Sequence, residues 1–225
     1  MTDAMPMIDM TIAHLRTQAE AATRDLPDGE PLDDLSRALI RLGVAVSVTS
    51  LSPDAISRTV DAALDAGASL DQVEEIIALV SGLGVHSLMI SQTIVLQSAA
   101  ARDLIDRAAP LDPARQALWD KHVGNDPFWI GFEQENPGFL DAMLRLCPDL
   151  FTAFFDYCAV PWKIGSVRAR TKELAAIACD AAPTHVFGPG FRLHLRNAIA
   201  LGATRRQIME SLDIAAEAPG HDGIV

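Results

Sequence analysis

The chain has 225 residues, 49% of them hydrophobic, and a formal net charge of −12 at pH 7. This length can bury a sizeable core in one large domain or two small ones. Nucleic acid and anionic membranes attract basic proteins, so the acidic balance argues against either as a partner. With no uninterrupted apolar run of about 18 residues and no signal-peptide pattern, we expect no transmembrane helix and a cytoplasmic location.

The predicted elements in chain order are almost all helices. An amino-terminal helical arm comes first, and three helices follow, the last with its N-cap at Ser69. A long apolar helix and an aromatic-rich connector occupy the middle of the chain. Three further helices resemble the first three, with the last N-cap at Thr204. Strand patterns are nearly absent, so we predict an all-α fold.

An internal repeat relates the two sets of three helices. At a constant offset of 135 residues, Gly67 aligns with Gly202, Glu75 with Glu210 and His86 with His221. A constant register over about fifty residues indicates duplication. The predicted units are a helical arm (1–30), a degenerate first repeat (31–110), an aromatic-rich connector (111–150) and a second repeat carrying the site (151–225).

Two stretches stand out in composition. Ten of the twelve aromatic residues lie between Trp119 and Trp162, and such a connector either plugs a core or roofs a pocket. The stretch "DAAPTHVFGPGFRLHLRN" (180–197) gathers two histidines, two arginines, an aspartate and four Pro or Gly residues. We interpret this second stretch as an active-site loop followed by an active-site helix.

With the repeat, these residues resemble the carboxymuconolactone decarboxylase / AhpD-like family. The similar segments are "PDLFTAFFDYCAVPWKIGSV", "RTKELAAIACDAA" and "FRLHLRNAIALGATRRQIMESL". The resemblance covers Phe151–His221 well and Leu35–His86 weakly. It implies an AhpD-like helical fold with two tandem carboxymuconolactone-decarboxylase-type repeats.

The resemblance implies one of two chemistries. AhpD-type peroxidases need a C-x-x-C with a histidine four residues after the second cysteine, and those positions hold Phe187 and Gly190 here. The decarboxylases lack the cysteines, and "FRLHLR" is similar to their pattern. We therefore favour a cofactor-independent lyase or isomerase acting on a small carboxylated or lactone ring compound. The alternatives are an AhpD-like peroxidase and a non-catalytic helical binding or assembly protein.

Three residues are candidates for catalysis. The resemblance makes His194 the proton shuttle, since imidazole titrates near neutrality. Glu173 matches an acidic position of the family and either orients His194 or is a solvated acid at a helix start. His185, on the preceding loop, is the third candidate, with an exposed turn histidine as the alternative.

The expected substrate-binding residues flank the same stretch. Arg192 is expected to clamp a substrate carboxylate, while Arg196 contacts substrate or makes a surface or intersubunit ion pair. The full expected set is Arg192, Arg196, Thr184, Trp162 and Asp180. The implied partners are a small anionic substrate and further copies of the chain, with a trimer first and a dimer next.

No metal or cofactor is expected. The three cysteines, Cys147, Cys158 and Cys179, form no C-x-x-C and are predicted to be small buried hydrophobes. A two-histidine, one-carboxylate site from His185, His194 and Asp180 is conceivable, but its spacing is not diagnostic. His86 and His221 align in the repeat and are expected to share a structural task at the ends of the third helices.

Overall fold

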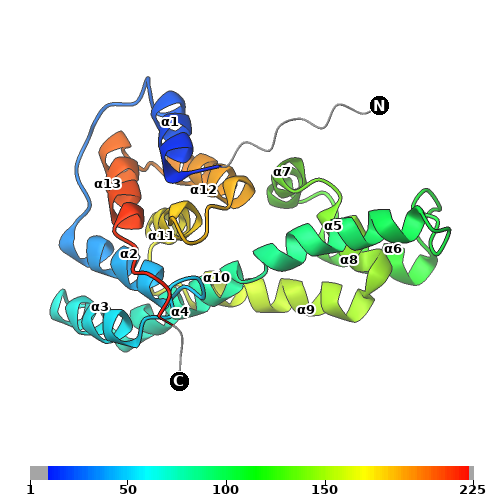
Figure 1. The fold of residues 1–225 in the computed structure, drawn as a ribbon, viewed down its shortest axis with the longest axis horizontal. Helices are drawn as coiled ribbons and strands as arrows, with labels where there is room; N and C mark the ends of the chain where they lie inside the picture. Colours follow the sequence, from blue (N-terminus) through cyan, green and yellow to red (C-terminus); the bar gives the residue numbers. More distant parts are fainter. Residues whose placement is uncertain (1–9, 223–225) are drawn as a thin grey trace.

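The computed structural model describes residues 10–222, which form a helical body and a helical arm (Figure 1). The body contains α1 (Ile12–Ala22), α2 (Asp34–Val46), α3 (Pro53–Asp65), α4 (Leu70–Leu83), α10 (Val160–Ile164), α11 (Ala169–Ala181), α12 (Gly188–Ala200) and α13 (Arg205–Ala216). The arm, which is a different segment from the amino-terminal arm predicted for residues 1–30, contains α5 (His86–Ala100), α6 (Pro113–His122), α7 (Pro127–Glu135), α8 (Phe139–Leu146) and α9 (Pro148–Cys158). No strand occurs within residues 10–222, so the all-α prediction is confirmed.

Helix α11 is the centre of the body. All its residues from Thr171 to Ala181 are buried, and it packs against α2, α12 and α13. A helix that is mainly small and apolar on every side fits only such an enclosed position. The carboxyl side chains of Glu173 and Asp180 are therefore held inside the core.

The helix ends follow the sequence pattern. Ser69 and Thr204 cap α4 and α13 in equivalent capping boxes, each closed by a glutamine three residues later. Gly67 and Gly202 end the preceding helices in the left-handed region, with φ values of 87° and 78°. Glycine takes up this conformation at no steric cost, which makes a tight helix hairpin possible in both units.

Contacts between the two three-helix units follow the 135-residue offset. Glu75 of α4 pairs with Lys172 of α11 at 2.6 Å, and the equivalent Glu210 of α13 pairs with Arg37 of α2 at 2.9 Å. Each third helix thus binds the first helix of the other unit. Two further bonds join equivalent residues directly, Ser36 to Thr171 and Thr49 to Thr184. Reciprocal contacts of this kind are what a duplicated unit packed on its copy would make, and the repeat itself stays a prediction.

The expectation that no segment could span a membrane was too strict. Leu70–Ala100, which comprises α4 and α5, is long and apolar enough by length and composition, with a mean hydropathy of 1.6 in its best window. The sequence criterion was an uninterrupted apolar run of about 18 residues, and this segment does not meet it. Within the fold, 39% of that window is buried, and core helices of soluble proteins pass the same test. Here α4 packs on α2 and α10, and α5 packs on α8.

Candidate active site

A cavity of about 610 Å³ lies where the arm meets the body. Its size is typical of a small-molecule site. The wall is largely apolar and draws on α4, α5, α7, α9, α10, α11 and α12. Its aromatic side chains are Phe128, Trp129, Phe132, Phe154, Phe155 and Trp162. The aromatic-rich part of the chain therefore encloses a pocket, besides forming a second core cluster within the arm.

A histidine–carboxylate pair stands in this wall. His194 of α12 and Glu173 of α11 both line the cavity, and the His194 Nδ1 atom lies 2.6 Å from Glu173 Oε2. Asn197, one turn further along α12, donates from Nδ2 to the other Glu173 oxygen at 3.2 Å. The two helices pack side by side, so the pair is built on rigid elements. Glu173 fixes the Nδ1 proton of His194 and leaves Nε2 for a ligand.

The electrostatics of the pair favour a charged imidazole. Burial acts to lower the pKa of His194, but the Glu173 hydrogen bond and the negative charges of Glu173 and Asp180 outweigh it and raise that pKa. Glu173 is buried, so of the two roles expected for it, the solvated acid at a helix start does not apply. The pair can accept a proton at Nε2 and hold the resulting imidazolium against a carboxylate.

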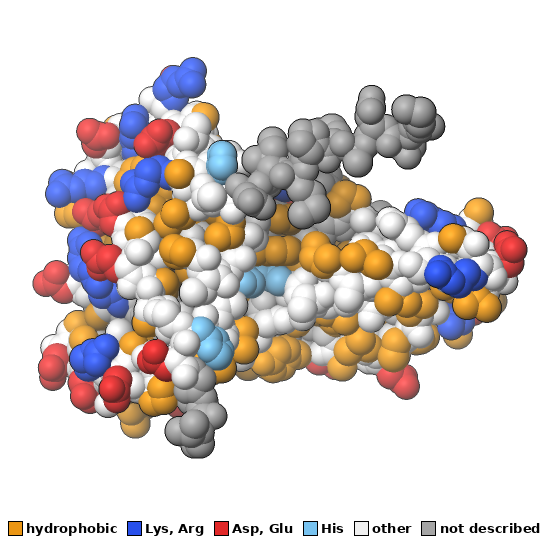
Figure 2. All heavy atoms as spheres, in the orientation of Figure 1, with side chains coloured by type: hydrophobic (Ala, Val, Ile, Leu, Met, Phe, Trp, Pro, Cys, Tyr) orange, Lys and Arg blue, Asp and Glu red, His pale blue; other side chains and the backbone are white. Residues whose placement is uncertain are grey.

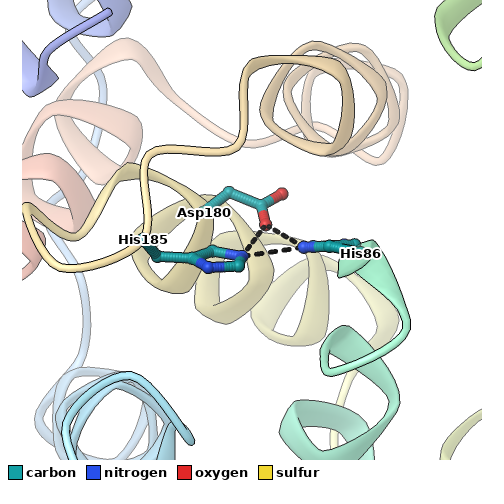
Figure 3. Close-up of side chains that lie close together, drawn as sticks. All are labelled: His86, Asp180 and His185. Carbon is teal, nitrogen blue, oxygen red and sulfur yellow. Dashed lines mark hydrogen bonds and ion pairs between the residues drawn. The ribbon is translucent and has the colours of Figure 1, made fainter. Parts of the chain in front are cut away.

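A second polar cluster lies beside the cavity (Figure 3). It joins His86 at the start of α5, Asp180 in the last turn of α11 and His185 on the following loop. His86 Nδ1 lies 2.8 Å from His185 Nε2, and Asp180 Oδ1 lies 3.6 Å and 3.8 Å from these two nitrogens. Of the three, only His86 lines the cavity. The cluster is therefore adjacent to the histidine–carboxylate pair and separate from it.

Burial dominates the titration of this cluster. It lowers the pKa of His86 to about 2, aided by His185 and His194, and it also lowers the pKa of His185. It raises the pKa of Asp180 to about 7 against the opposing charge of His194, and the Glu173 charge acts in the same direction as burial. Both imidazoles are therefore neutral near pH 7, with lone pairs available.

The loop between α11 and α12 is shaped around Asp180. A Cβ atom on Gly190 would lie 2.6 Å from Asp180 Oδ2, so only glycine permits this approach of α12. Val186 lies in the left-handed region with φ 49°, as does its repeat equivalent Leu51 with φ 42°. A β-branched residue is strained there. The turn after the first helix is thus shared by both units, while the polar residues beside it are not.

The structure corrects the carboxylate clamp expected of Arg192 and gives Arg196 the ion pair that was one of its two expected roles. Neither Arg192 nor Arg196 lines the cavity. Both pair with Glu135 at the end of α7, Arg192 through Nε at 2.7 Å. Their charges are thus used to hold α7, with Phe128 and Trp129, over the cavity. The sequence could not reveal this, because Glu135 lies 57 residues before Arg192.

The other predicted residues divide between several places. Trp162 lines the cavity as expected, with the Lys172 ammonium 4.9 Å above its ring. Thr184 hydrogen-bonds Thr49 and does not line the cavity. His86 opens α5, whereas it was expected to end the third helix. Its place in the polar cluster was missed, as was the contact of Asn197 with Glu173.

The cysteines were only partly predicted. Cys179 is buried as expected, whereas Cys147 and Cys158 are half-buried. Cys158 lines the cavity, and burial raises its pKa to about 11. Burial, with the Asp180 charge, also raises the pKa of Cys179. Neither of these two groups is a thiolate at neutral pH, the form that attacks peroxides and disulfides.

The first unit has a smaller counterpart of the cavity. This space of about 200 Å³ lies between α2, α3 and α13. Its wall has Thr59, Ala55 and Ala45 at the positions that align with His194, Gly190 and Asp180. This smaller hollow thus lacks the groups for proton transfer that line the larger cavity.

Comparisons with known proteins show one family match and one similar solved structure. Residues 148–224, which include Glu173 and His194, match the family model of the "Carboxymuconolactone decarboxylase family". The crystal structure of a "putative gamma-carboxymuconolactone decarboxylase subunit" from Burkholderia xenovorans LB400 is similar, with a TM-score of 0.70 and 28% identity. The match covers 93% of this chain and 91% of that chain. No curated protein matches the sequence.

Proposed function

We propose that this chain is a cofactor-independent lyase or isomerase that moves a proton at a carbon atom of a small ring compound. Its residues 148–224 match the carboxymuconolactone decarboxylase family model, and its fold is similar to that of a putative decarboxylase subunit. The observation that carries this proposal is the His194–Glu173 pair, joined at 2.6 Å in the wall of an apolar cavity of about 610 Å³. A positioned imidazole of this kind contributes about 10²- to 10⁴-fold to proton transfer.

The residues can support two related reactions. In an isomerisation, neutral His194 takes a proton through Nε2 from carbon next to a carbonyl, and the imidazolium returns it elsewhere. In a decarboxylation, the carbon–carbon bond breaks, CO₂ leaves and the electron pair remains as an enolate. The His194 imidazolium then protonates the enolate carbon. Glu173 stabilises the imidazolium in both cases, and Asn197 holds the Glu173 carboxylate.

The cavity wall narrows the class of substrate. None of its described residues is a lysine or an arginine. No guanidinium group in the wall can therefore bind a substrate carboxylate in the way that was expected of Arg192. An anionic group would meet the His194 imidazolium and the Asn197 amide, and the rest of the ligand would contact aromatic rings. A ring compound with one carboxylate or a lactone, and an otherwise apolar skeleton, fits this wall.

The peroxidase alternative has little support from the geometry. A cysteine at position 190 would need space that Asp180 Oδ2 fills, since even a Cβ atom would come within 2.6 Å of it. Cys158 lines the cavity, but burial keeps its thiol protonated. A binding protein without catalysis is the remaining rival, and it predicts affinity for a ligand without turnover.

A screen in deuterated solvent tests the proposal. Wild-type protein is incubated with muconolactone-like and β-keto-acid compounds, and proton NMR follows substrate loss and deuterium at carbon. We expect at least one compound to be consumed with incorporation of solvent deuterium, because the proton passes through His194. Ligand-induced chemical shifts without consumption or exchange would favour the binding protein instead.

A cysteine-free variant is the control for the peroxidase alternative. Replacing Cys147, Cys158 and Cys179 by serine or alanine should leave turnover largely intact, because the proposed mechanism uses no thiol. Circular dichroism establishes that the variant is folded. Loss of turnover in a folded cysteine-free protein would restore the redox interpretation.

Assembly is a further part of the proposal. The exposed face of α5 presents three large apolar side chains, Ile90, Ile94 and Val95, each about half exposed, and hydrophobic side chains also gather over the arm in Figure 2. Such a face is a common site of contact between copies of a chain. We expect a homotrimer, with a dimer as the next possibility, and a monomer by light scattering at micromolar concentration would contradict it.

A further inference from the structure

Asp180 is the buried group that the proposed mechanism leaves unexplained. Its side chain is wholly buried, and neither carboxylate oxygen has a hydrogen-bond partner among residues 10–222. Leaving a buried carboxylate without a partner is costly. The carboxylate points at two histidine nitrogens (Figure 3), but at 3.6 Å and 3.8 Å these lie beyond hydrogen-bond distance. No direct hydrogen bond from the described residues compensates the charge of the ionised carboxylate.

A hydrogen bond between the two histidines explains only part of the cluster. His86 Nδ1 and His185 Nε2 lie 2.8 Å apart, so one proton can bridge them. That proton lies between the two imidazole nitrogens and forms no hydrogen bond to Asp180. The cluster as a whole therefore brings two imidazole nitrogens and a carboxylate oxygen within 4.8 Å of one another, and the bond between the imidazoles leaves Asp180 without a hydrogen-bond partner among the described residues.

The distances match the first coordination shell of a small cation. The three donor atoms form a triangle with sides of 2.8, 3.6 and 3.8 Å. The point equidistant from its corners lies about 2.0 Å from each of them, the distance at which zinc binds imidazole nitrogen and carboxylate oxygen. Calcium and magnesium prefer oxygen ligands throughout, so two imidazoles favour a transition metal.

The surrounding packing holds the donors in place. The Phe187 ring stacks on His86 with 3.9 Å between centroids, which fixes the plane of that imidazole. Gly190 leaves room for Asp180 Oδ2, and no larger residue would. His86 belongs to α5 of the arm, whereas Asp180 and His185 belong to the body. An ion bound here would join the arm to the body directly beside the cavity.

We propose that His86, Asp180 and His185 bind one divalent transition-metal ion, for which Zn²⁺ is the best match. The ion occupies the space between α5, α11 and the loop after α11, and His194 and Glu173 are not among its ligands. The conceivable site of His185, His194 and Asp180 is thereby replaced, since the structure places His86 where His194 was considered. The site goes beyond the proposed function, because proton transfer at His194 does not require it.

Metal analysis and thermal unfolding test the site without any substrate. The full chain without a polyhistidine tag is stripped with a chelator, mixed with one equivalent of ZnSO₄ and gel-filtered. We expect about one zinc ion per chain by mass spectrometry, and a rise in Tm of several degrees, because an ion that binds only the folded state stabilises it. Retention of no zinc with an unchanged Tm would overturn the proposal.

Two variants and one control locate the ion. His185→Ala removes a ligand from a loop, and Asp180→Asn keeps the shape of the buried side chain. Both should lose the retained zinc and the Tm rise while keeping their helical circular dichroism. His221→Ala, which removes an exposed histidine outside the cluster, should retain both. Equal zinc retention by wild type and both cluster variants would place the ion elsewhere and refute the assignment.

Discussion

Replacing His194 with alanine is expected to lower turnover by about 10²-fold or more, the usual effect of losing a general acid–base group. The reason is geometric, since His194 lines the cavity and binds Glu173 through Nδ1. Initial rates with the best compound from the screen provide the measurement. Far-UV circular dichroism should remain close to that of the wild type, whereas the Tm should fall, because buried Glu173 keeps only Asn197 as a hydrogen-bond partner.

The repeat supplies a matched control for this variant. Thr59→Ala changes the aligned residue of the first unit, which lies in the smaller hollow and bonds only the backbone of its own helix. Its turnover should match that of the wild type. If His194→Ala and Thr59→Ala turned over substrate equally well, His194 would have no part in the reaction.

Glu173→Gln extends the same test to the partner of His194. It should reduce turnover less than His194→Ala does, since Glu173 does not itself take the substrate proton. Glu173 raises the pKa of His194, as does the charge of Asp180, while buried His86 is the other ionisable group near this imidazole. Removing the Glu173 charge should lower the pKa of His194 and move its limb of the pH–rate profile to lower pH. An unshifted profile would show that Glu173 does not act through His194.

Much of the body could be predicted because its determinants are local. Capping residues, glycine at the helix ends and apolar periodicity all act within a few residues, and the repeat shows the same pattern twice. The burial of α11 can also be predicted from the sequence, since "ELAAIACDAA" is apolar and small on nearly every side. Glu173 and His194 were paired through the family resemblance, and the packing of α11 on α12 places them together.

The cavity and the second cluster could not be predicted in the same way. His86 and His185 are 99 residues apart, and their contact depends on how α5 crosses the body. Glu135 meets Arg192 and Arg196 only because α7 folds back from the arm onto α12. Residue types suggested chemistry for these arginines, whereas long-range packing decided that they pair with a glutamate. The composition of the aromatic-rich connector favoured a core plug over the roof of a pocket, whereas in the structure its aromatic residues do both.

Replacing Lys172 with alanine is expected to lower the free energy of unfolding by about 3 kcal/mol, because it leaves a buried carboxylate without its counter-ion. Lys172 is 3% exposed, and its Nζ atom donates to Glu75 Oε1 at 2.6 Å and to the Pro161 carbonyl at 2.9 Å. The partner Glu75 is wholly buried in α4. Urea unfolding followed by circular dichroism measures the loss as a lower transition midpoint with an unchanged slope.

The equivalent pair of the other repeat unit separates burial from charge pairing. Arg37 binds Glu210 at 2.9 Å in the same reciprocal arrangement, but its side chain is 35% exposed. Water can solvate what Arg37→Ala leaves behind, so this variant should lose about 1 kcal/mol or less. The double variant Lys172→Met with Glu75→Gln should recover part of the loss, since no buried charge remains. If Lys172→Ala cost no more than Arg37→Ala, the ion pair would contribute through pairing alone, and the buried junction between α4 and α11 would tolerate an unpaired glutamate.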